Sequence, residues 1–573
     1  MTDVVIGIDT GTTATKAIAA GLDGRLRART SVHYPLSVPA PGRAEISPSD
    51  LIGAAVTALR DVRAACDAQG DRVVGVSLSA FLHGLVPMDA DGKPLGPLIT
   101  WADGRAGDQC DEIIASGRAK GLHGRTGTPV HPMAPLSKLA WWRSEDPGLL
   151  RDTPRWGGVK ELILSALVDR SFLLDLSVAS GTGLYDIHRR QWDPEAMEIA
   201  GVRDGQLAEV VPTTKVLKVG DLPLVVGAAD GPLANLGLGA TPAGVAAVSL
   251  GTSGAVRTIV DRPTADADGR LFCYALTEDR WAIGGAVNNA GSVVRWAGQS
   301  FASGFERPGA EGEDADERDA ALLIEAQGAP PGSDGLLCLP YLLGERAPWW
   351  RSGLRGAYLG LRREHGRAHL VRAAVEGVCQ QLALVRDSFA TEGFEVREVR
   401  ATGGSTASEL WVGVLAAALN LPVAIADTPE GTALGACLLG WHALGELPDL
   451  DHAAALVEIG EPTRPDPADA ELYARLRPLV EKAALSVLET VRELDRLAPL
   501  PETAAHPHAA ETAAHPHAAE TAAHPHAAET AAHPHAAETA AHPHAAETAA
   551  HPHADSGGGR GTRVDGPPDG RKR

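Results

Sequence analysis

Cysteines are few and widely spaced in this sequence. Its 573 residues include six of them: Cys66, Cys110, Cys273, Cys338, Cys379 and Cys437. No two form a C-x-x-C pair, so the spacing argues against a disulfide framework and against a zinc site built on such pairs. Scattered cysteines are typical of proteins in a reducing compartment, and we therefore expect a cytoplasmic protein.

The sequence also lacks long apolar runs and an excess of basic charge. No run of about 18 apolar residues is present, so a membrane-spanning helix is not expected. The first residues form a strand-like run rather than the pattern of a signal peptide. The formal net charge of -21 argues against nucleic acid or an anionic membrane as a partner. Because this charge repels anions, a phosphate site here needs local donors and a cation.

The first turn of the chain lacks both common phosphate-binding glycine motifs. In "VIGIDTGTTATKAIA" (5–19), neither the lysine loop G-x-x-x-x-G-K-[ST] nor the dinucleotide pattern G-x-G-x-x-G is present. Instead, an apolar run ends at Asp9, and a turn containing Thr12 and Thr13 leads into a second apolar run. The pattern predicts a β-hairpin with hydroxyl groups at its turn.

A second stretch has the same layout about 240 residues further along the chain. In "GVAAVSLGTSGAVRTIV" (244–260), the turn Gly251-Thr252-Ser253-Gly254 joins two apolar strands. Two such hairpins indicate two domains built on one plan, although coincidence is the alternative, because glycine turns between strands are common. We expect an N-terminal domain over 1–242, a C-terminal domain over 243–498, and a tail over 499–573.

Helical and strand-like patterns alternate along the first 500 residues. Strand-like runs include 72–78 and 222–227. Helical patterns cover 49–69, 108–120, 135–144, 366–391, 431–446 and 469–497. This alternation predicts an α/β fold with layered sheets and helices in both domains.

A third glycine element lies in "EVREVRATGGSTASELWVGVLAAALNLPV" (395–423). A β-prone run ends at Gly403-Gly404, and Thr406 with Glu409 three residues later has the spacing of a capping box. Glycines before a helix N-terminus let a nucleotide approach free backbone N–H groups. Many strand-to-helix turns share this pattern, so taken alone it is weak evidence for a nucleotide site.

The segment "DLPLVVGAADGPLANLG" (221–237) contains a candidate catalytic residue. Asp230 follows a buried strand and lies just before Pro232, which suits the first turn of a helix. A helix N-terminus favours the charged form of a carboxyl group, and a carboxylate at a strand end suits a general base. The alternative is that Asp230 only caps the helix.

A group of polar residues in "SLSAFLHGLVPMDADGKPLGPLITWADGRAGD" (77–108) matches what a polyhydroxylated ligand requires. His83, Trp101, Asp103 and Arg105 lie at the ends of apolar runs. An aromatic face can cover C–H groups, while the polar side chains bond hydroxyls. The alternatives are a core position for Trp101 and a surface ion pair for Asp103 and Arg105.

Two proline-containing loops are further candidates for ligand binding. "GRTGTPVHPMAPLSKLAWW" (124–142) carries His131 and Lys138, and "PYLLGERAPWW" (340–350) carries Glu345 and Arg346. Neither loop indicates a particular reaction by itself.

The last part of the chain differs in composition from the rest. From Glu502 a nine-residue AETAAHPHA-type unit recurs six times, followed by "DSGGGRGTRVDGPPDGRKR". A proline in every unit prevents a continuous helix, and no unit has an apolar side chain larger than alanine that could form a core. We expect a disordered, solvated tail whose histidines bind divalent metal, such as nickel or zinc, at most weakly.

Taken together, these motifs resemble the FGGY carbohydrate kinases. The family's C-terminal signature is matched by "GAYLGLRREHGRAHLVRAAVE" (356–376), and its other signature nearly by "MAPLSKLAWWRSE" (133–145), where Trp142 and Ser144 depart from it. Within the family the likeness is to the bacterial gluconokinases, through "ITWADGR", "RTGTPVHPMAPLSK", "GTSGAVR", "FCYALTE", "VNNAG" and "YLLGERAP". These stretches extend over nearly the whole chain before the tail.

The resemblance implies a duplicated actin-like (ribonuclease H-like) ATPase fold, with two domains around a central cleft. It also implies transfer of a phosphoryl group from ATP, with Mg²⁺, to a terminal sugar hydroxyl. In this family Asp230 corresponds to the catalytic base, and Asp9 to the carboxylate near the metal, acting through water. The segment between Pro212 and Asp221 is shorter than is usual in such kinases, and we interpret it as a trimmed surface excursion.

The remaining roles are also implied by the resemblance. Thr12 and Thr13 fall in the first phosphate loop, and Gly251, Thr252 and Ser253 in the second. Gly403 and Gly404 match the loop that holds the nucleotide. The sugar-binding positions are those of His83, Trp101, Asp103 and Arg105.

These implications give D-gluconate as the expected phosphate acceptor and 6-phosphogluconate as the product. The pocket then needs a cation or N–H donors for the acceptor's carboxylate, and Arg105, His131, Lys138 and Arg346 are all open candidates. A xylulose kinase or another pentulose or polyol kinase is the alternative within the family. A catalytically inactive ATP-binding protein on the same fold is the alternative from another class. The sequence leaves the oligomeric state open, a homodimer included.

Overall fold

The computed structural model describes residues 1–168, 172–301, 313–351, 353–426, 428 and 430–497. The described residues belong to one compact unit. The tail predicted over 499–573, with its histidine repeats, lies outside the described residues. The boundary predicted at 242/243 falls inside the compact unit and stays a prediction.

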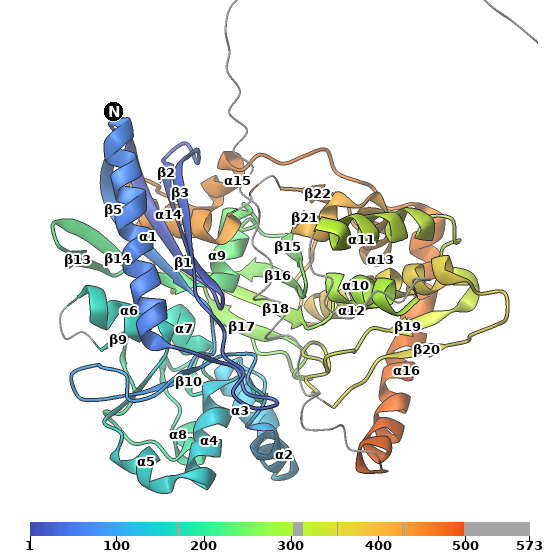
Figure 1. The fold of residues 1–573 in the computed structure, drawn as a ribbon, viewed down its shortest axis with the longest axis horizontal. Helices are drawn as coiled ribbons and strands as arrows, with labels where there is room; N and C mark the ends of the chain where they lie inside the picture. Colours follow the sequence, from blue (N-terminus) through green and yellow to red (C-terminus); the bar gives the residue numbers. More distant parts are fainter. Residues whose placement is uncertain (169–171, 302–312, 352, 427, 429, 498–573) are drawn as a thin grey trace, which may run out of the picture. The chain divides into compact units, whose positions relative to one another are not determined.

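The first sheet has six strands in the order β13-β14-β5-β1-β2-β3 (Figure 1). Its strands are β1 (Asp3–Thr10), β2 (Ala14–Gly21), β3 (Leu26–His33), β5 (Arg72–Ala80), β13 (Val216–Val219) and β14 (Leu222–Ala229). The β1–β2 and β2–β3 pairs are antiparallel, whereas β1, β5 and β14 run parallel. The short segment between Pro212 and Asp221 forms the edge strand β13, which pairs antiparallel with β14.

The second sheet repeats this plan with strands in the order β17-β18-β16-β15-β21-β22. Its strands are β15 (Val245–Leu250), β16 (Gly254–Val260), β17 (Phe272–Ala275), β18 (Trp281–Val287), β21 (Glu398–Thr402) and β22 (Val423–Ile425). The β15–β16 hairpin pairs antiparallel with β18 on one side, while β15, β21 and β22 run parallel on the other. The hairpin β1–β2 has the same neighbours in the first sheet, so the duplication predicted from the two hairpins is confirmed.

Most predicted helices are present with nearly the predicted bounds. They are α1 (Pro48–Gln69), α4 (Pro135–Glu145), α12 (Arg367–Thr391), α14 (Gly431–Ala443) and α16 (Pro467–Leu497). The single helix predicted over 108–120 is instead two, α2 (Gly107–Ala115) and α3 (Ala119–Thr126). The break falls at Gly117, whose φ of 78° is a left-handed conformation that ends a helix.

The capping box predicted at Thr406 is wrong. Helix α13 (Glu409–Leu419) begins at Glu409 itself, and Thr406 belongs to a short 3-10 turn, Gly404–Ala407. The Thr406 hydroxyl donates a hydrogen bond to the carbonyl of Gly403 at 2.7 Å. This extra turn between strand and helix moves the N-cap two residues along the chain, from Thr406 to Ser408.

The other helices are short or lie at the periphery. They are α5 (Pro147–Asp152), α6 (Val159–Leu167), α7 (Leu176–Ser180), α8 (Pro194–Ala200), α9 (Asp230–Gly237), α10 (Gly291–Phe301), α11 (Glu313–Ala326) and α15 (Ala453–Leu456). The short strands are β4 (Glu45–Ile46), β6 (Val86–Met88), β7 (Leu98–Ile99), β8 (Arg155–Gly157), β9 (Leu173–Asp175), β10 (Tyr185–Asp186), β11 (Gln191–Trp192), β12 (Glu209–Val211), β19 (Leu337–Leu339) and β20 (Ala357–Leu359). Among the helices of the described ranges, none has the length and apolar character that crossing a membrane requires.

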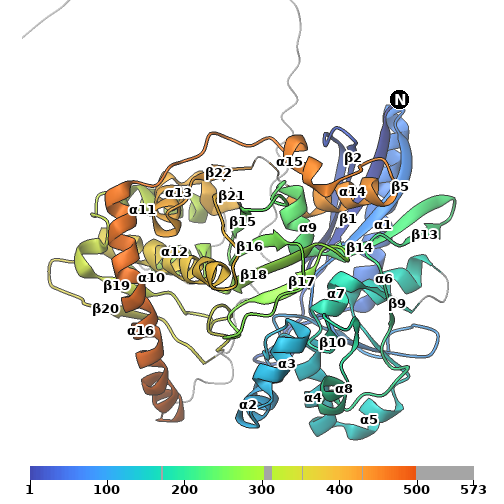
Figure 2. The same ribbon diagram turned by 180° about the vertical axis from the view of Figure 1, so that it is seen from behind.

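Both faces of the first sheet are covered by helices, α1 on one face and α14 on the other (Figures 1 and 2). This explains the continuous apolar run of β1, because alternate side chains enter two different cores. Val4 and Ile6 belong to the core on the α1 side, while Val5 belongs to the core that includes α14. The second of these cores also contains Ala247 of the second sheet, so it joins the two halves of the unit.

Within this shared core, α9 and α14 approach each other so closely that only glycine fits at their contact. A Cβ atom on Gly237 would lie 1.7 Å from the carbonyl oxygen of Gly431, and one on Gly435 would lie 2.0 Å from that of Leu233. Distances this short are far inside van der Waals contact. The two helices therefore pack backbone against backbone.

We predict that Gly435→Ala destabilises the protein, because the added methyl group must push α9 and α14 apart. The expected loss is on the order of 3 kcal/mol, measured as a lower midpoint of thermal unfolding. Gly413→Ala is the matched control, since Gly413 also lies within a helix but a Cβ there would meet nothing within 4 Å. The control should leave the midpoint unchanged or raise it slightly. Equal midpoints for the two variants would contradict the close helix contact.

Candidate active site

The predicted base and the predicted metal-side carboxylate lie at the same edge of the first sheet. Asp9 pairs in register with Ser79 of β5, and Ser79 pairs with Ala228 of β14. Asp230 follows Ala228 by two residues and is the first residue of α9. Because β1, β5 and β14 are parallel, all of these positions are at carboxyl ends, where α/β sheets bind ligands.

Asp9 has a half-buried carboxylate whose hydrogen-bond partner is a neutral hydroxyl. Its Oδ1 accepts a hydrogen bond from the Ser79 hydroxyl at 2.7 Å. Burial, partly opposed by the Ser79 hydrogen bond, raises the pKa of Asp9 to about 6. The cross-strand lysine, Lys16, instead forms an ion pair with Glu430 at 3.1 Å. Within the described ranges Asp9 has no ion pair of its own, which suits a bound cation.

Asp230 lies beside two positive side chains. Burial raises the pKa of its carboxyl group, and the positive charges of Arg257 and Arg346 act in the opposite direction. Its Oδ1 accepts a hydrogen bond from the N–H of the adjacent residue, Gly231, at 2.8 Å. An N-cap side chain accepts a hydrogen bond from the N–H two or three residues later in the chain. The bond from Gly231 is therefore not the helix cap that was the alternative role for Asp230.

A buried lysine supports the strand ends behind Asp230. The Lys160 ammonium donates hydrogen bonds to the carbonyls of Leu78, Val226 and Ala228 at 3.1, 2.9 and 3.2 Å, and it lies 3.4 Å from Asp175. Both charged side chains are fully buried. Lys160 was not identified from the sequence, although a lysine within the largely apolar run "GVKELILSAL" indicates a buried charge.

The residue before Asp230 is held as well. The N–H of Ala229 donates to the Ser177 hydroxyl at 3.1 Å, and Asp175 caps the helix that contains Ser177, accepting from Val178 N at 2.9 Å. The backbone that carries Asp230 is therefore fixed on two sides.

The turn of the first hairpin exposes its threonines partly to solvent. Thr12 and Thr13 are both half-buried. The turn is closed by a hydrogen bond from Gly11 N to Ala14 O at 3.0 Å and is braced by Tyr34, whose hydroxyl bonds the Gly11 carbonyl. The hydroxyls of Thr12 and Thr13 thus lie on a fixed turn, and their assignment to phosphate stays a prediction.

The turn of the second hairpin is held by the start of α10. The N–H of Gly291 donates to Gly251 O at 2.9 Å, and that of Ala290 donates to Thr252 O at 3.1 Å. Gly251 is exposed, whereas Thr252 and Ser253 are half-buried. The carbonyl groups of the turn are thus engaged, and the hydroxyls of Thr252 and Ser253 stay candidate donors to a ligand.

The Gly403-Gly404 loop lies against the same hairpin. Gly403 has a φ of 108°, and a Cβ atom there would lie 2.4 Å from Leu250 O, so only glycine fits. A Cβ atom on Gly291 would lie 2.9 Å from Gly251 O and 3.1 Å from the Ser405 hydroxyl. The structure therefore brings the predicted second phosphate loop and the predicted nucleotide loop together.

His83 is buried and electrically neutral. Its Nδ1 lies 2.8 Å from the carbonyl oxygen of Gly181, and because a carbonyl can only accept, Nδ1 carries the hydrogen. Burial and the positive charge of Lys138 lower the pKa of His83 to about 3. The neutral ring then presents Nε2 as an acceptor, which is what a sugar hydroxyl needs.

Lys138 is a structural residue in this arrangement. It is fully buried, and its ammonium donates to the carbonyls of His83 and Thr100 at 2.6 and 2.7 Å. These two bonds join the His83 turn to the strand end before Trp101. Lys138 was one of the residues considered for binding the carboxylate of the substrate. In the structure, two of its three N–H donors bond backbone carbonyls instead.

Trp101 packs against Arg346 from the loop predicted at 340–350. The Arg346 guanidinium lies 5.1 Å from the centre of the Trp101 ring, and its Nε donates to Asn288 Oδ1 at 2.6 Å. The neighbouring Glu345 is fully buried and accepts from Asn288 N at 2.7 Å and from Asn289 Nδ2 at 3.0 Å. Glu345 therefore fixes the loop, and Arg346 lies against Trp101.

Asp103 and Arg105 form a buried ion pair, so the surface-pair alternative is wrong. The Asp103 carboxylate accepts from Arg105 Nε at 2.8 Å and from its terminal nitrogen at 2.7 Å. Arg105 also pairs with Glu45 and lies over the Trp141 ring at 5.1 Å. Only 6% of the Arg105 side chain is exposed. Their assignment to the sugar stays a prediction.

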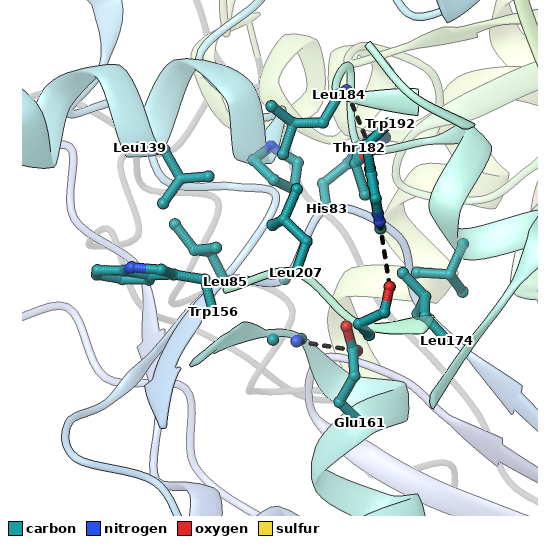
Figure 3. Close-up of a pocket in the computed structure, with 16 residues that line it drawn as sticks. His83, Leu85, Leu139, Trp156, Glu161, Leu174, Thr182, Leu184, Trp192 and Leu207 are labelled. Carbon is teal, nitrogen blue, oxygen red and sulfur yellow. Dashed lines mark hydrogen bonds between the residues drawn. The ribbon is translucent and has the colours of Figure 1, made fainter. Parts of the chain in front are cut away.

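A small cavity behind the His83 turn is separate from this site. It has a volume of about 30 Å³ and is lined by His83, Leu139, Trp156, Glu161 and neighbouring residues (Figure 3). This space fits one or two water molecules and is far too small for a sugar or a nucleotide. Asp9 and Asp230 do not line it.

Two further residues of the candidate site were not identified from the sequence. Arg257 of β16 and Tyr274 of β17 both lie near Asp230, and each interacts electrostatically with it. Both occur in stretches that carry the family resemblance, "GTSGAVR" and "FCYALTE", but their roles depend on contacts between distant strands.

Comparisons with known proteins agree with this geometry. The N-terminal domain of the FGGY family of carbohydrate kinases matches residues 4–234, and the C-terminal domain of that family matches residues 246–444. The chain is 39% identical over 495 residues to a gluconokinase of Bacillus subtilis, covering 84% of this chain and 95% of that protein.

Solved structures give the same result. A gluconate kinase from Lactobacillus acidophilus superimposes with a TM-score of 0.80 at 30% identity, covering 86% of this chain and 100% of that one. A ligand-bound xylulose kinase from the same species has a TM-score of 0.80 at 31% identity and the same coverage. The chain belongs to the FGGY family of carbohydrate kinases. It is an ATP-dependent sugar kinase with the duplicated actin-like fold that the resemblance implied.

We predict that Glu161 makes stability depend on pH. Burial raises its pKa to about 7, while its carboxylate accepts from Gly158 N at 3.0 Å. The folded state therefore keeps a proton that the unfolded state loses above about pH 4.5, and stability falls as the pH rises from there to about 7. At about 1.4 kcal/mol per unit, the loss is about 3 kcal/mol.

Glu161→Gln removes this titration and keeps the hydrogen-bond acceptor. The unfolding midpoint of the variant should exceed that of the wild type at pH 8, with the difference shrinking or reversing at pH 5. The control is the same exchange at Glu112, an exposed residue of α2. A difference between Glu161→Gln and wild type that is constant with pH would contradict the prediction.

Proposed function

We propose that this enzyme transfers the γ-phosphoryl group of ATP to the terminal hydroxyl of D-gluconate, giving 6-phospho-D-gluconate. The observation that carries the proposal is the placement of Asp230 beside Arg257 and Arg346. Positive charge near the base suits an acceptor that is itself an anion. The identity of 39% to a gluconokinase supports the same substrate.

In this proposal Asp230 accepts the proton of the acceptor hydroxyl as that oxygen attacks the γ-phosphorus. The bond between the γ-phosphorus and the β-phosphate oxygen breaks, and ADP leaves. One carboxylate oxygen is held by Gly231 N at 2.8 Å, which leaves the other for the substrate. Lys160 and Ser177 fix the backbone behind it, so the base is oriented before the substrate binds. His83 Nε2 accepts from a second hydroxyl of the sugar.

The phosphate groups of ATP are assigned to the two hairpin turns. Thr12 and Thr13 provide donors from the first turn, and Thr252 and Ser253 from the second, beside Gly251. The loop at Gly403-Gly404 holds the nucleotide, because its glycines leave the backbone accessible. Such positioning and neutralisation of charge supply most of the catalysis in phosphoryl transfer.

Mg²⁺ fits the unpaired carboxylate of Asp9. Within the described residues no cluster of three or more His, Cys, Asp or Glu side chains could hold a metal ion. Mg²⁺ usually takes only one or two protein carboxylates, with water and substrate phosphates as its other ligands. When bound, the ion would neutralise the phosphate charge, and Asp9 would hold it through water.

Two properties outside the site belong to the same proposal. We place the enzyme in the cytoplasm, since all six cysteines are free and buried, as expected in a reducing compartment. We also keep the division of the unit into domains over 1–242 and 243–498, because each range contains one of the two six-stranded sheets.

A panel of acceptors tests the substrate directly. With ATP and Mg²⁺, we predict a kcat/KM for D-gluconate at least 10-fold above that for D-xylulose, D-ribulose or glycerol, because the cations beside Asp230 favour an acid. The xylulose alternative has support from the xylulose kinase structure with a TM-score of 0.80. A preference for xylulose would contradict D-gluconate as the substrate, while membership of the FGGY family would stand.

Replacing the base tests the mechanism. Asp230→Asn should lower kcat by about 10²–10⁴-fold, while the affinity for ATP, measured by calorimetric titration, stays within about twofold. Near-normal turnover would refute the role of Asp230. Absence of turnover in the wild type with every acceptor, together with ATP binding, would support the alternative of an inactive ATP-binding protein.

A further inference from the structure

The side chain of Arg257 runs through a path that two glycines leave open. A Cβ atom on Gly284, its cross-strand partner in β18, would lie 2.9 Å from Arg257 Cγ. A Cβ atom on Gly231 would lie 3.3 Å from Arg257 Nε. The guanidinium therefore reaches from β16 to the amino end of α9, next to Asp230.

At that position the Arg257 guanidinium is unpaired. Within the part of the chain that the structure describes, it has neither an ion pair nor a side-chain hydrogen bond, and its electrostatic partners are Asp230 and Tyr274. Arg346 differs, because it donates to Asn288 Oδ1 at 2.6 Å and to Val287 O at 3.1 Å. A half-buried cation with free donors is unfavourable until it meets an anion.

Tyr274 has an unsatisfied hydroxyl at the same place. The residue is 3% exposed, and its hydroxyl oxygen is buried without a hydrogen-bond partner among the described residues. The ring itself is fixed: it stacks on Phe272 with centroids 4.3 Å apart and meets the edge of His83 at 5.9 Å. Buried hydroxyls are normally hydrogen-bonded, so this one is available to a ligand.

Arg257 and Tyr274 lie on one face of the second sheet, because Arg257 and Phe272 pair with the same residue of β18 and Tyr274 follows Phe272 by two positions. The positive charges of Arg346 and Arg257 both act on the Tyr274 hydroxyl, opposing the rise in its pKa caused by burial. One free guanidinium, one free hydroxyl and a second arginine form a set that recognises an anionic oxygen.

Two anions could bind here, the carboxylate of the acceptor or the phosphoryl group in transit. Arg257 lies three residues beyond Gly254, where the second hairpin turn ends. At about 3.3 Å per residue this is about 10 Å along the strand from the predicted phosphate loop. Tyr274 meets His83, a predicted sugar-side residue. The contact between Tyr274 and His83 favours the acceptor.

We infer that Arg257 and Tyr274 bind the carboxylate of the acceptor and make the site selective for sugar acids over neutral polyols. This inference rests on the proposed function. The arginine supplies charge and paired N–H donors, and the tyrosine supplies one O–H donor. Arg346, held against Trp101, forms the wall of the same subsite.

The test compares D-gluconate with D-glucitol, which has the same carbon chain with a neutral alcohol in place of the carboxylate. Arg257→Gln should weaken gluconate binding by about 100-fold and Tyr274→Phe by about 10-fold, while glucitol binding changes less than twofold. Binding is measured by calorimetric titration without nucleotide, so that no phosphoryl transfer contributes. Steady-state kinetics should show the loss mainly in KM for gluconate.

Thermal unfolding distinguishes a binding role of Tyr274 from a structural one. Because the Tyr274 hydroxyl is unpaired, Tyr274→Phe should leave the unfolding midpoint unchanged or raise it. The control is Tyr358→Phe, which removes a hydroxyl that donates to Leu370 O at 2.9 Å. That control should lower the midpoint and keep the preference for gluconate over glucitol.

Two results would overturn the inference. Equal losses for gluconate and glucitol, with kcat reduced for both, would assign Arg257 and Tyr274 to the phosphoryl group. If the variants keep the wild-type preference for gluconate, neither residue binds the carboxylate, and the proposed function still stands. If instead the wild type binds no sugar acid, the proposed function itself fails.

Discussion

The close packing of α9 against α14 is the constraint on which the candidate site depends. Asp230 begins α9, and this helix donates from Asn235 to the carbonyl of Arg257 in the second sheet at 3.3 Å. On the other side α14 packs on β1, where a Cβ atom on Gly7 would lie 2.2 Å from Ala433 O. The helix pair thus connects the base to the strand of Asp9 through contacts that leave no room for a side chain, and the Asn235 amide connects it to the strand of Arg257. Any change in this spacing would move the carboxylates relative to the arginines.

Buried charges in this protein fall into two groups according to whether they are satisfied. Lys160, Lys138 and Glu345 are fully buried and bonded to backbone or side-chain groups, so they fix loops and strand ends. Asp9 and Arg257 are half-buried charged groups without ion pairs in the described part of the chain. Because an uncompensated buried charge is unfavourable, groups of the second kind mark where ligands are expected. The division separates positioning from binding without reference to sequence motifs.

Local sequence patterns predicted the parts of the structure that local physics determines. Both hairpins, the duplicated plan and most helices followed from apolar runs, glycine turns and helical periodicity. The errors were also local: Gly117 divides the helix predicted over 108–120, and an extra turn displaces the cap predicted at Thr406. The missed residues are non-local. The Arg257 path depends on Gly231 and Gly284, and the Asp103–Arg105 pair is completed by Glu45, about 60 residues away. A single sequence does not indicate which strands become neighbours, so these contacts were not predictable.

The central claim is that Asp230 and the two hairpin turns form one site for phosphoryl transfer to a sugar acid. A crystal structure with D-gluconate and a non-hydrolysable ATP analogue tests this most directly. The account predicts the terminal hydroxyl within about 3 Å of the Asp230 carboxylate, phosphates at both turns, and the acceptor's carboxylate against Arg257 and Tyr274. A complex in which Asp230 contacts no hydroxyl of the acceptor, or in which the phosphates contact neither turn, would contradict it.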